Sequence, residues 1–184
     1  MHTARLLLVS TAATLTVGLA ATPALAAPSD ATTVTFQILA GTLDIDAPAT
    51  VGLGSGTSGA AISGSAGPTT VIDSRASAVA SWVATVTSSN FQTAGGTPAE
   101  TVLADEIDYW SGPATTTTGN GTFTPGQTTA GGAGPLDDVA PLTAFTHTGG
   151  TGNNTATWNP TLNVNVPLDN QSGVYTGTVT HSVA

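Results

Sequence analysis

The chain has 184 residues and a formal net charge of −9, with 11 acidic residues, two arginines and no lysine. Proteins that bind DNA or RNA contact phosphates through clustered Lys and Arg, so this balance excludes nucleic-acid binding. The lack of cysteine excludes disulfides, thiolate zinc sites and a cysteine nucleophile.

The first 26 residues have the features of a secretory signal peptide. A short basic start precedes an apolar run over residues 6–21, and Ala24 and Ala26 supply the small residues that signal peptidase requires. We expect cleavage between Ala26 and Ala27. An uncleaved membrane anchor is the alternative, although the run is short for a span of about 20 residues. The mature chain, residues 27–184, is then exported and carries no membrane span.

The composition of the mature chain predicts an all-β fold. Thr and Val are abundant, and both are β-branched residues that favour strands. The 22 glycines and 11 prolines interrupt the chain often, as many short strands joined by turns require. We therefore predict one antiparallel β-sandwich domain with long loops rich in Gly and Thr.

Seven segments alternate apolar and polar residues with the period of two that marks a strand. In chain order they are residues 33–38, 42–46, 51–53, 70–73, 81–87, 162–166 and 173–180. Residues 169–173 are typical of a hairpin loop between the last two of these strands. Residues 93–157 are less regular, and we interpret them as hairpins and long loops. Within them we expect a tight turn at residues 120–121 and a short helix at residues 100–108.

Two parts of the chain resemble the halves of a known domain. The first reads DSR at 73–75 and SWVATV at 81–86, and the second reads WNPTL at 158–162 and SGVYTGTV at 172–179. Together they resemble the WxL domain, a family of secreted proteins that attach non-covalently to the cell wall of Gram-positive bacteria. The motif leucine is replaced by alanine in the first half and by proline in the second.

This resemblance covers nearly all of the mature chain and implies an all-β domain located at the cell wall or cell surface. Its implied partners are a peptidoglycan-type wall polymer and other surface proteins. Trp82, Trp158 and Trp110 are the candidate wall-binding residues, because an aromatic face stacks on a sugar ring at little entropic cost. The alternative is that these rings are core residues, and Trp82 shares its strand face with two apolar neighbours.

The charged residues are interpreted structurally. Asp73 and Arg75 lie on one face of an extended segment, and we expect them to form a structural ion pair, with anion recognition as the alternative. Three carboxylate clusters are interpreted as an acidic solvated surface, and calcium is the alternative ligand, although none has a twelve-residue calcium loop. The clusters are Asp44 with Asp46, Asp105 with Glu106 and Asp108, and Asp137 with Asp138.

Catalysis has little support in the sequence. The chain has no nucleophile motif, and no spacing singles out a pair of carboxylates, so we expect no catalytic residues, no cofactor and no metal site. The first hypothesis is a secreted, non-enzymatic protein that binds the bacterial cell wall. The second is a structural or adhesive subunit that assembles by pairing edge strands. The third is a secreted hydrolase.

Overall fold

The computed structural model of the chain describes residues 28–184. The predicted signal peptide and its cleavage site at Ala26 and Ala27 lie outside these residues. Almost all regular structure within them is β-strand, which confirms the all-β prediction, and no helix there has the length and apolarity of a membrane span. The elements are β1 (Leu43–Asp46), β2 (Ala61–Ser65), β3 (Thr69–Ser88), β4 (Phe91–Gln92), β5 (Thr101–Val102), β6 (Ile107–Trp110), β7 (Ala114–Thr118), β8 (Thr122–Pro125), β9 (Gly134–Pro135), β10 (Leu142–Trp158), β11 (Thr161–Asn165) and β12 (Val179–Val183), with 3-10 turns η1 (Pro98–Glu100), η2 (Ala104–Glu106) and η3 (Ala130–Gly132).

Two long strands, β3 and β10, form an antiparallel ribbon that organises the fold. On the outer edge of β3, β1 pairs with its first half and β12 with its second half. On the outer edge of β10, β8 pairs with its first half and β7 with its second half. Each half of the ribbon is therefore the centre of a four-stranded layer.

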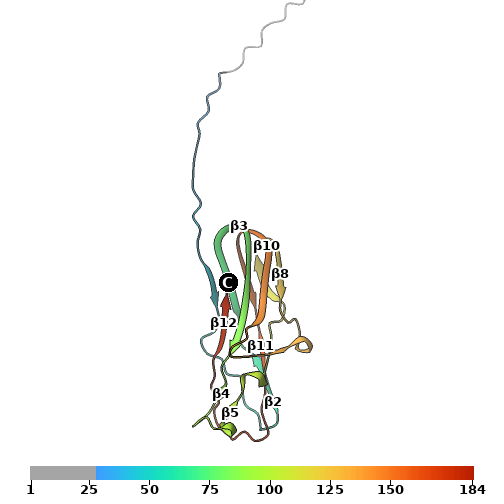
Figure 1. Cartoon of the computed structure of the whole chain (residues 1–184). Coiled ribbons are helices and arrows are strands. Elements are labelled where there is room, and N and C mark those ends of the chain that lie inside the picture. Colours follow the sequence, from blue (N-terminus) through green and yellow to red (C-terminus); the bar gives the residue numbers. More distant parts are fainter. Residues whose placement is uncertain (1–27) are drawn as a thin grey trace, which may run out of the picture. The chain divides into compact units, whose positions relative to one another are not determined.

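The ribbon folds over on itself at its middle. Phe145 and Trp158 are thirteen residues apart in β10, which a straight strand would separate by about 43 Å. Their rings instead stack with centroids 4.9 Å apart. The register shifts between His147 and Asn154, and Ala76 on β3 has a positive φ of 51°, so both strands are irregular at the bend. Figure 1 shows β3 and β10 turning over together, which brings the two layers face to face as a sandwich.

The hydrophobic core lies between these layers because alternate residues of each strand point inward. The inward row of β3 is almost fully buried, whereas the outward row is largely threonine, serine and exposed valine. Small and aromatic side chains fill the space together, with Ala84 and Ala156 beside the large rings. The buried apolar residues of the layers are Val71, Trp82, Ala84, Val86, Ala144, Phe145, Ala156 and Trp158.

A second antiparallel sheet, in the order β2-β11-β6-β9, takes β2 from before the ribbon, β6 and β9 from between its two strands, and β11 from after it. Its strand β11 starts at Thr161, three residues after Trp158, and the inward residues of the sheet join the same core. Tyr109 on β6 is fully buried, and its hydroxyl accepts a hydrogen bond of 3.2 Å from the Trp158 indole N–H. This bond ties the small sheet to β10. A separate two-stranded ladder joins β4 to β5.

The predicted hairpin between the last two strands is wrong. β11 pairs with β2 and β6 in the small sheet, whereas β12 starts only at Val179 and pairs with β3 in the sandwich. Residues 166–178 therefore carry the chain from one sheet to the other. Asn170 explains why the loop does not form a hairpin, because its buried side-chain amide donates to the Thr101 carbonyl at 2.9 Å and holds the loop against β5.

Two other predicted segments lie in the described part of the chain but do not form strands there. Residues 51–53 form no strand, and Leu53 packs on the core from a loop instead. Residues 33–38 are extended but unpaired, and residues 28–36 form a unit apart from residues 37–184. The two predicted strands at residues 70–73 and 81–87 are both present. They are parts of one strand, β3, whose twenty residues run through the bend.

The irregular middle of the chain contains more strand than its sequence predicts. The expected helix over residues 100–108 is replaced by η1, β5, η2 and the start of β6, because β-branched Thr101 and Val102 pair with β4. The chain does turn at residues 120–121, where Gly119 and Gly121 have positive φ. This turn joins β7 to β8 in different layers. The second strand of the ribbon, β10, was not predicted.

Candidate functional site

Trp82 and Trp158 are core residues, which corrects their assignment as wall-binding platforms. Their exposed fractions are 2% and 0%, so neither ring presents a face that could stack on a sugar. Trp82 packs against Phe145 and against the His147 ring, whose centroid is 5.7 Å away. Trp158 is enclosed between Phe145 and Tyr109. Both tryptophans occupy inward positions of the ribbon, where burial of a large apolar ring stabilises the fold.

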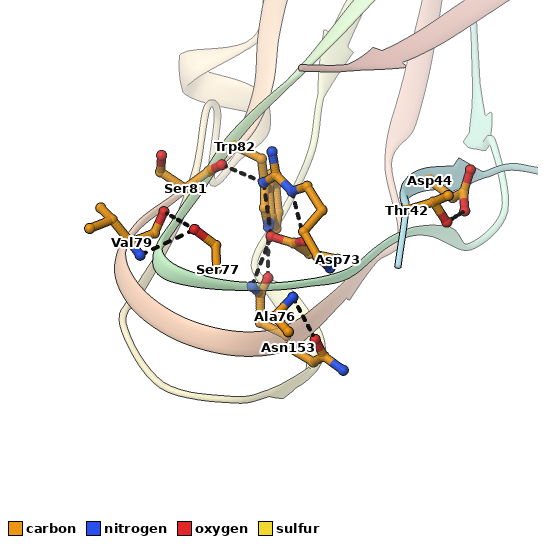
Figure 2. A network of polar contacts seen from close by, with 11 residues as sticks. Thr42, Asp44, Asp73, Ala76, Ser77, Val79, Ser81, Trp82 and Asn153 are labelled. Carbon is orange, nitrogen blue, oxygen red and sulfur yellow. Dashed lines mark hydrogen bonds and ion pairs between the residues drawn. The ribbon is translucent and has the colours of Figure 1, made fainter. Parts of the chain in front are cut away.

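Asp73 and Arg75 form an ion pair at the bend of the ribbon (Figure 2). Arg75 Nε lies 2.9 Å from Asp73 Oδ1, and Nη2 lies 2.9 Å from Oδ2, so the guanidinium binds the carboxylate through two parallel bonds. Nη2 also donates to the Ser81 carbonyl. These bonds, chiefly the one from the Arg75 side chain, lower the pKa of Asp73 to about 2. The guanidinium is thereby committed to the protein's own groups rather than to an external anion.

Asn154 extends this network across the interior, and sequence reasoning missed it. Its side-chain Nδ2 donates to Asp73 Oδ2 at 3.2 Å, and its Oδ1 accepts the Trp82 indole N–H at 2.7 Å. Next to it, Asn153 Oδ1 accepts the backbone N–H of Ala76. The signal was present as two consecutive asparagines in a stretch of threonine and glycine. This site is structural, since its polar groups bond one another inside the bend.

The third tryptophan, Trp110, lies on the outward face of the small sheet. Strand alternation directs Ile107 and Tyr109 into the core, so Asp108 and Trp110 point the other way and are only half-buried. The register places Asp108 opposite Asn163, and Trp110 opposite Thr161. On the other side of β11, serines of β2 complete the same rows. We call this surface the amide face, and it consists of Ser63, Ser65, Glu106, Asp108, Trp110, Thr161, Asn163 and Asn165.

The polar side chains of the amide face hold one another in place. Asp108 Oδ2 accepts a hydrogen bond of 2.9 Å from Asn165 Nδ2 and a longer one of 3.4 Å from Asn163 Nδ2. Asn163 Nδ2 also donates to Asn165 Oδ1 at 3.0 Å. Among the described residues, Asp108 Oδ1 and Asn163 Oδ1 have no partner, so both remain able to accept hydrogen bonds from a ligand.

Two open cavities continue the amide face beyond Asn165. One of about 320 Å³ is lined by Asn165, Glu106 and Pro167. The next, of about 430 Å³, shares Glu106 and Pro167 and extends to Asp169 and Gln92. The small sheet therefore presents three features one after another: a half-buried tryptophan, a row of amides and carboxylates, and a hollow surface.

The carboxylate clusters do not gather into a metal site in residues 28–184. Within this range, no group of three or more His, Asp or Glu side chains has an arrangement that could hold a metal ion. Asp44 accepts a hydrogen bond from Thr42, and Asp137 accepts backbone N–H groups of Val139 and Ala140. Glu106 and Asp108 lie on the amide face, whereas Asp105 is exposed beside them.

Comparisons with models of protein families, with curated proteins and with solved structures find no match to this chain. The amide face is therefore the part of the described chain whose chemistry bears on function.

Proposed function

We propose that the mature chain is a secreted, non-enzymatic protein that attaches non-covalently to the bacterial cell wall by binding a glycan on the amide face. The observation that carries this proposal is the row of Trp110 and Asp108 on β6, continued by Glu106 at the end of η2, beside the asparagines of β11. A pyranose ring has an apolar face that packs on an indole, and hydroxyls at its edge that bond carboxylates and amides.

Preorganisation supports binding at this face. The asparagine side chains are fixed by Asp108 before any ligand arrives, so little rotamer entropy is lost when a sugar hydroxyl replaces water. From Trp110 to Ile107 the strand β6 extends about 10 Å, at roughly 3.3 Å per residue, and Glu106 follows directly at the end of η2. The cavity next to Glu106 lengthens this track further. A linear polymer makes better use of such a track than a single sugar does.

Charge indicates which part of the wall the face would bind. The amide face has two carboxylates, Glu106 and Asp108, and no cationic side chain. The single arginine among the described residues, Arg75, is paired with Asp73. A polymer of phosphate groups would be repelled by this face. We therefore assign neutral stretches of a peptidoglycan-type glycan as the ligand.

The test is sedimentation of the mature chain with purified sacculi from which the phosphate polymers have been removed. Trp110→Ala should weaken binding about tenfold, which corresponds to about 1.4 kcal/mol of lost stacking and buried area. Asn163→Ala should weaken it in the same direction. The matched control is Phe36→Ala, which removes an aromatic ring that is 87% exposed and distant in sequence from the amide face.

Two results would overturn the proposal. Wild-type protein that stays in the supernatant would show that the chain does not bind the wall glycan. Wild-type binding that Trp110→Ala and Asn163→Ala leave unchanged would show that another surface binds it. Release of soluble sugar during the incubation would instead favour the hydrolase hypothesis, with Glu106 and Asp108 as the first carboxylates to replace.

A further inference from the structure

A groove of about 430 Å³ lies between two parts of the chain that are distant in sequence. One wall is formed by η1, β5 and η2, and the other by the loop between β11 and β12. The groove combines apolar with acidic side chains. Its apolar residues are Pro98, Leu103 and Pro167, and its acidic residues are Glu106 and Asp169. Leu103 is 50% exposed, so the apolar part of the groove is open to a ligand.

Hydrogen bonds hold the two walls of this groove together. The buried Asn170 side chain donates to the Thr101 carbonyl at 2.9 Å, and the backbone N–H of Gln171 donates to the Ala99 carbonyl at 2.8 Å. The Tyr175 hydroxyl donates to the Gln171 carbonyl, also at 2.8 Å, and so ties the loop to itself. The groove is therefore formed before any ligand arrives, and binding there costs little ordering of the chain.

The two carboxylates of the groove have no cationic partner within residues 28–184. The chain contains no lysine, and Arg75, the single arginine in that range, is bound to Asp73 in the bend. Glu106 ends η2, whereas Asp169 lies on the opposite wall. A compact ammonium, whose three N–H groups point in different directions, suits carboxylates on separate walls better than a planar guanidinium does. Charge complementarity therefore favours a lysine, which neither this chain nor a second copy of it can supply.

We propose that this groove binds a lysine side chain on a peptide segment of another protein. The aliphatic stem of the lysine packs on Leu103 and the two prolines, while its ammonium bonds Glu106 and Asp169. Gln92 lines the same groove, and its exposed side-chain amide can donate to and accept from the peptide backbone beside the lysine. A free amine without a peptide would leave this amide unused, which is why a peptide is the favoured source of the ammonium.

This site goes beyond the proposed glycan binding and can be tested apart from it. It uses neither Trp110 nor the asparagines of β11. Glu106 belongs both to the amide face and to the groove, whereas Asp169 and Leu103 line the groove and lie outside the amide face. Variants of Asp169 and Leu103 therefore report on the lysine site, and Trp110→Ala reports on the glycan site.

The first test titrates the isotope-labelled mature chain, residues 27–184, with the peptide acetyl-Ala-Lys-Ala-amide and follows the amide signals by NMR. Signals of residues 98–106 and 167–171 should shift and saturate. The matched peptide carries norleucine, which keeps the aliphatic stem without the charge, and it should bind several-fold more weakly. The absence of saturable shifts in these segments would overturn the proposal, and so would equal binding of the norleucine peptide. Equal binding of cadaverine, a diamine without a peptide backbone, would overturn the assignment to a peptide.

The second test repeats the titration with variants whose fold is checked by circular dichroism. Asp169→Asn should weaken binding of the lysine peptide about two- to fivefold, as the loss of one exposed ion pair predicts. Leu103→Ala should weaken it in the same direction. The matched control Asp46→Asn removes an exposed carboxylate on β1 and should bind as the wild type does, and so should Trp110→Ala. Folded Asp169→Asn and Leu103→Ala variants with wild-type affinity would overturn the assignment of the peptide to this groove.

Discussion

Asp73 lies at the point where the ribbon folds over, and its bonds explain why that bend is stable. The carboxylate is 1% exposed and accepts hydrogen bonds from the Arg75 side chain and backbone and from Asn154. A buried carboxylate is costly unless its oxygens are paired in this way. Asn154 passes the connection on to Trp82 in the facing layer. One acidic residue therefore links the ion pair, the bend and the core.

Replacing Asp73 by Asn should destabilise the protein. The variant leaves Arg75 without its counter-ion, and because that side chain is 35% exposed, water offsets part of the loss. We expect a decrease in the free energy of unfolding of about 2 kcal/mol, measured by urea denaturation at pH 7. Asp46→Asn, which alters an exposed carboxylate on β1, should change it little. Equal urea midpoints for the two variants would contradict this role for Asp73.

The pH dependence of Asp73 has a defined sign. Its pKa is about 2 in the folded protein, below its ordinary value of 3.8, so the folded state favours the charged form. The resulting stability is complete above pH 3.8 and is lost as the pH falls to about 2. Urea midpoints between pH 4 and pH 2 should fall more steeply for the wild type than for Asp73→Asn.

His181 should make the stability of the protein depend on pH in a higher range than Asp73 does. Burial lowers its pKa to about 4, and its ring nitrogen Nε2 lies 3.3 Å from the Tyr109 hydroxyl. Because the unfolded chain takes up a proton near pH 6.5 and the folded chain does so only near pH 4, stability should decrease as the pH falls through that interval. His181→Gln should remove this part of the pH dependence in thermal unfolding measured from pH 7 to pH 4. A wild type whose melting temperature is constant over this range would contradict the prediction.

Among the elements, the ribbon of β3 and β10 determines which tryptophans are buried. Its fold-back encloses Trp82 and Trp158 between the layers, whereas Trp110 belongs to the small sheet and points outward. The glycine at position 150 permits this packing, because a Cβ there would collide with the buried His147 ring. The bend thus separates the two buried tryptophans from Trp110, whose ring is partly exposed.

Trp158→Ala should therefore mainly reduce stability, whereas Trp110→Ala should mainly reduce binding. Removing the fully buried Trp158 ring leaves a cavity and should reduce the free energy of unfolding by about 3–5 kcal/mol. Removing the half-buried Trp110 ring should cost much less stability but reduce sedimentation with sacculi. Chemical denaturation and the binding assay on the same preparations would check both effects. Equal destabilisation by the two variants would contradict the assignment of Trp110 to a surface site.

The sequence predicted the strand character of the chain better than its pairing. Alternation correctly marked β1, β11 and both ends of β3. It could not reveal that residues 70–73 and 81–87 belong to one strand, because the bend between them has no alternation. The glycines at 149, 150 and 152 concealed β10 in the same way. Pairing partners depend on contacts between residues that are distant in sequence, which explains the wrong hairpin.

The candidate site shows the same limit. Trp110 and the acidic residues beside it were named from the sequence, but their common face depends on the register between β6 and β11. Asn163 and Asn165 read as the polar half of an alternating strand, with nothing to connect them to Asp108. The apolar neighbours of Trp82 on its strand face supported the core alternative rather than its assignment as a wall-binding residue, whereas the strand of Trp158 was not recognised.

For the whole molecule, electrostatics are dominated by acidic surface. The net charge is −9, and the described part of the chain contains one basic side chain, Arg75, which is already paired. Attraction between opposite charges therefore cannot bring this protein to a negatively charged wall. The proposed attachment would come from stacking, hydrogen bonds and shape, which screening by salt affects little.

Binding to sacculi that keep their anionic polymers should consequently persist or become stronger as salt is added. At 10 mM ionic strength the Debye length is about 30 Å, and repulsion between the acidic protein and anionic wall polymers is strong. At 150 mM it is about 8 Å, so the repulsion is largely screened while contacts on the amide face remain. The fraction of protein that sediments should be equal or higher at 150 mM. A chelator tests whether divalent cations bridge the protein's carboxylates to wall phosphates, and it should leave this fraction unchanged. Binding that falls as salt rises would show an attraction between opposite charges and contradict the glycan assignment.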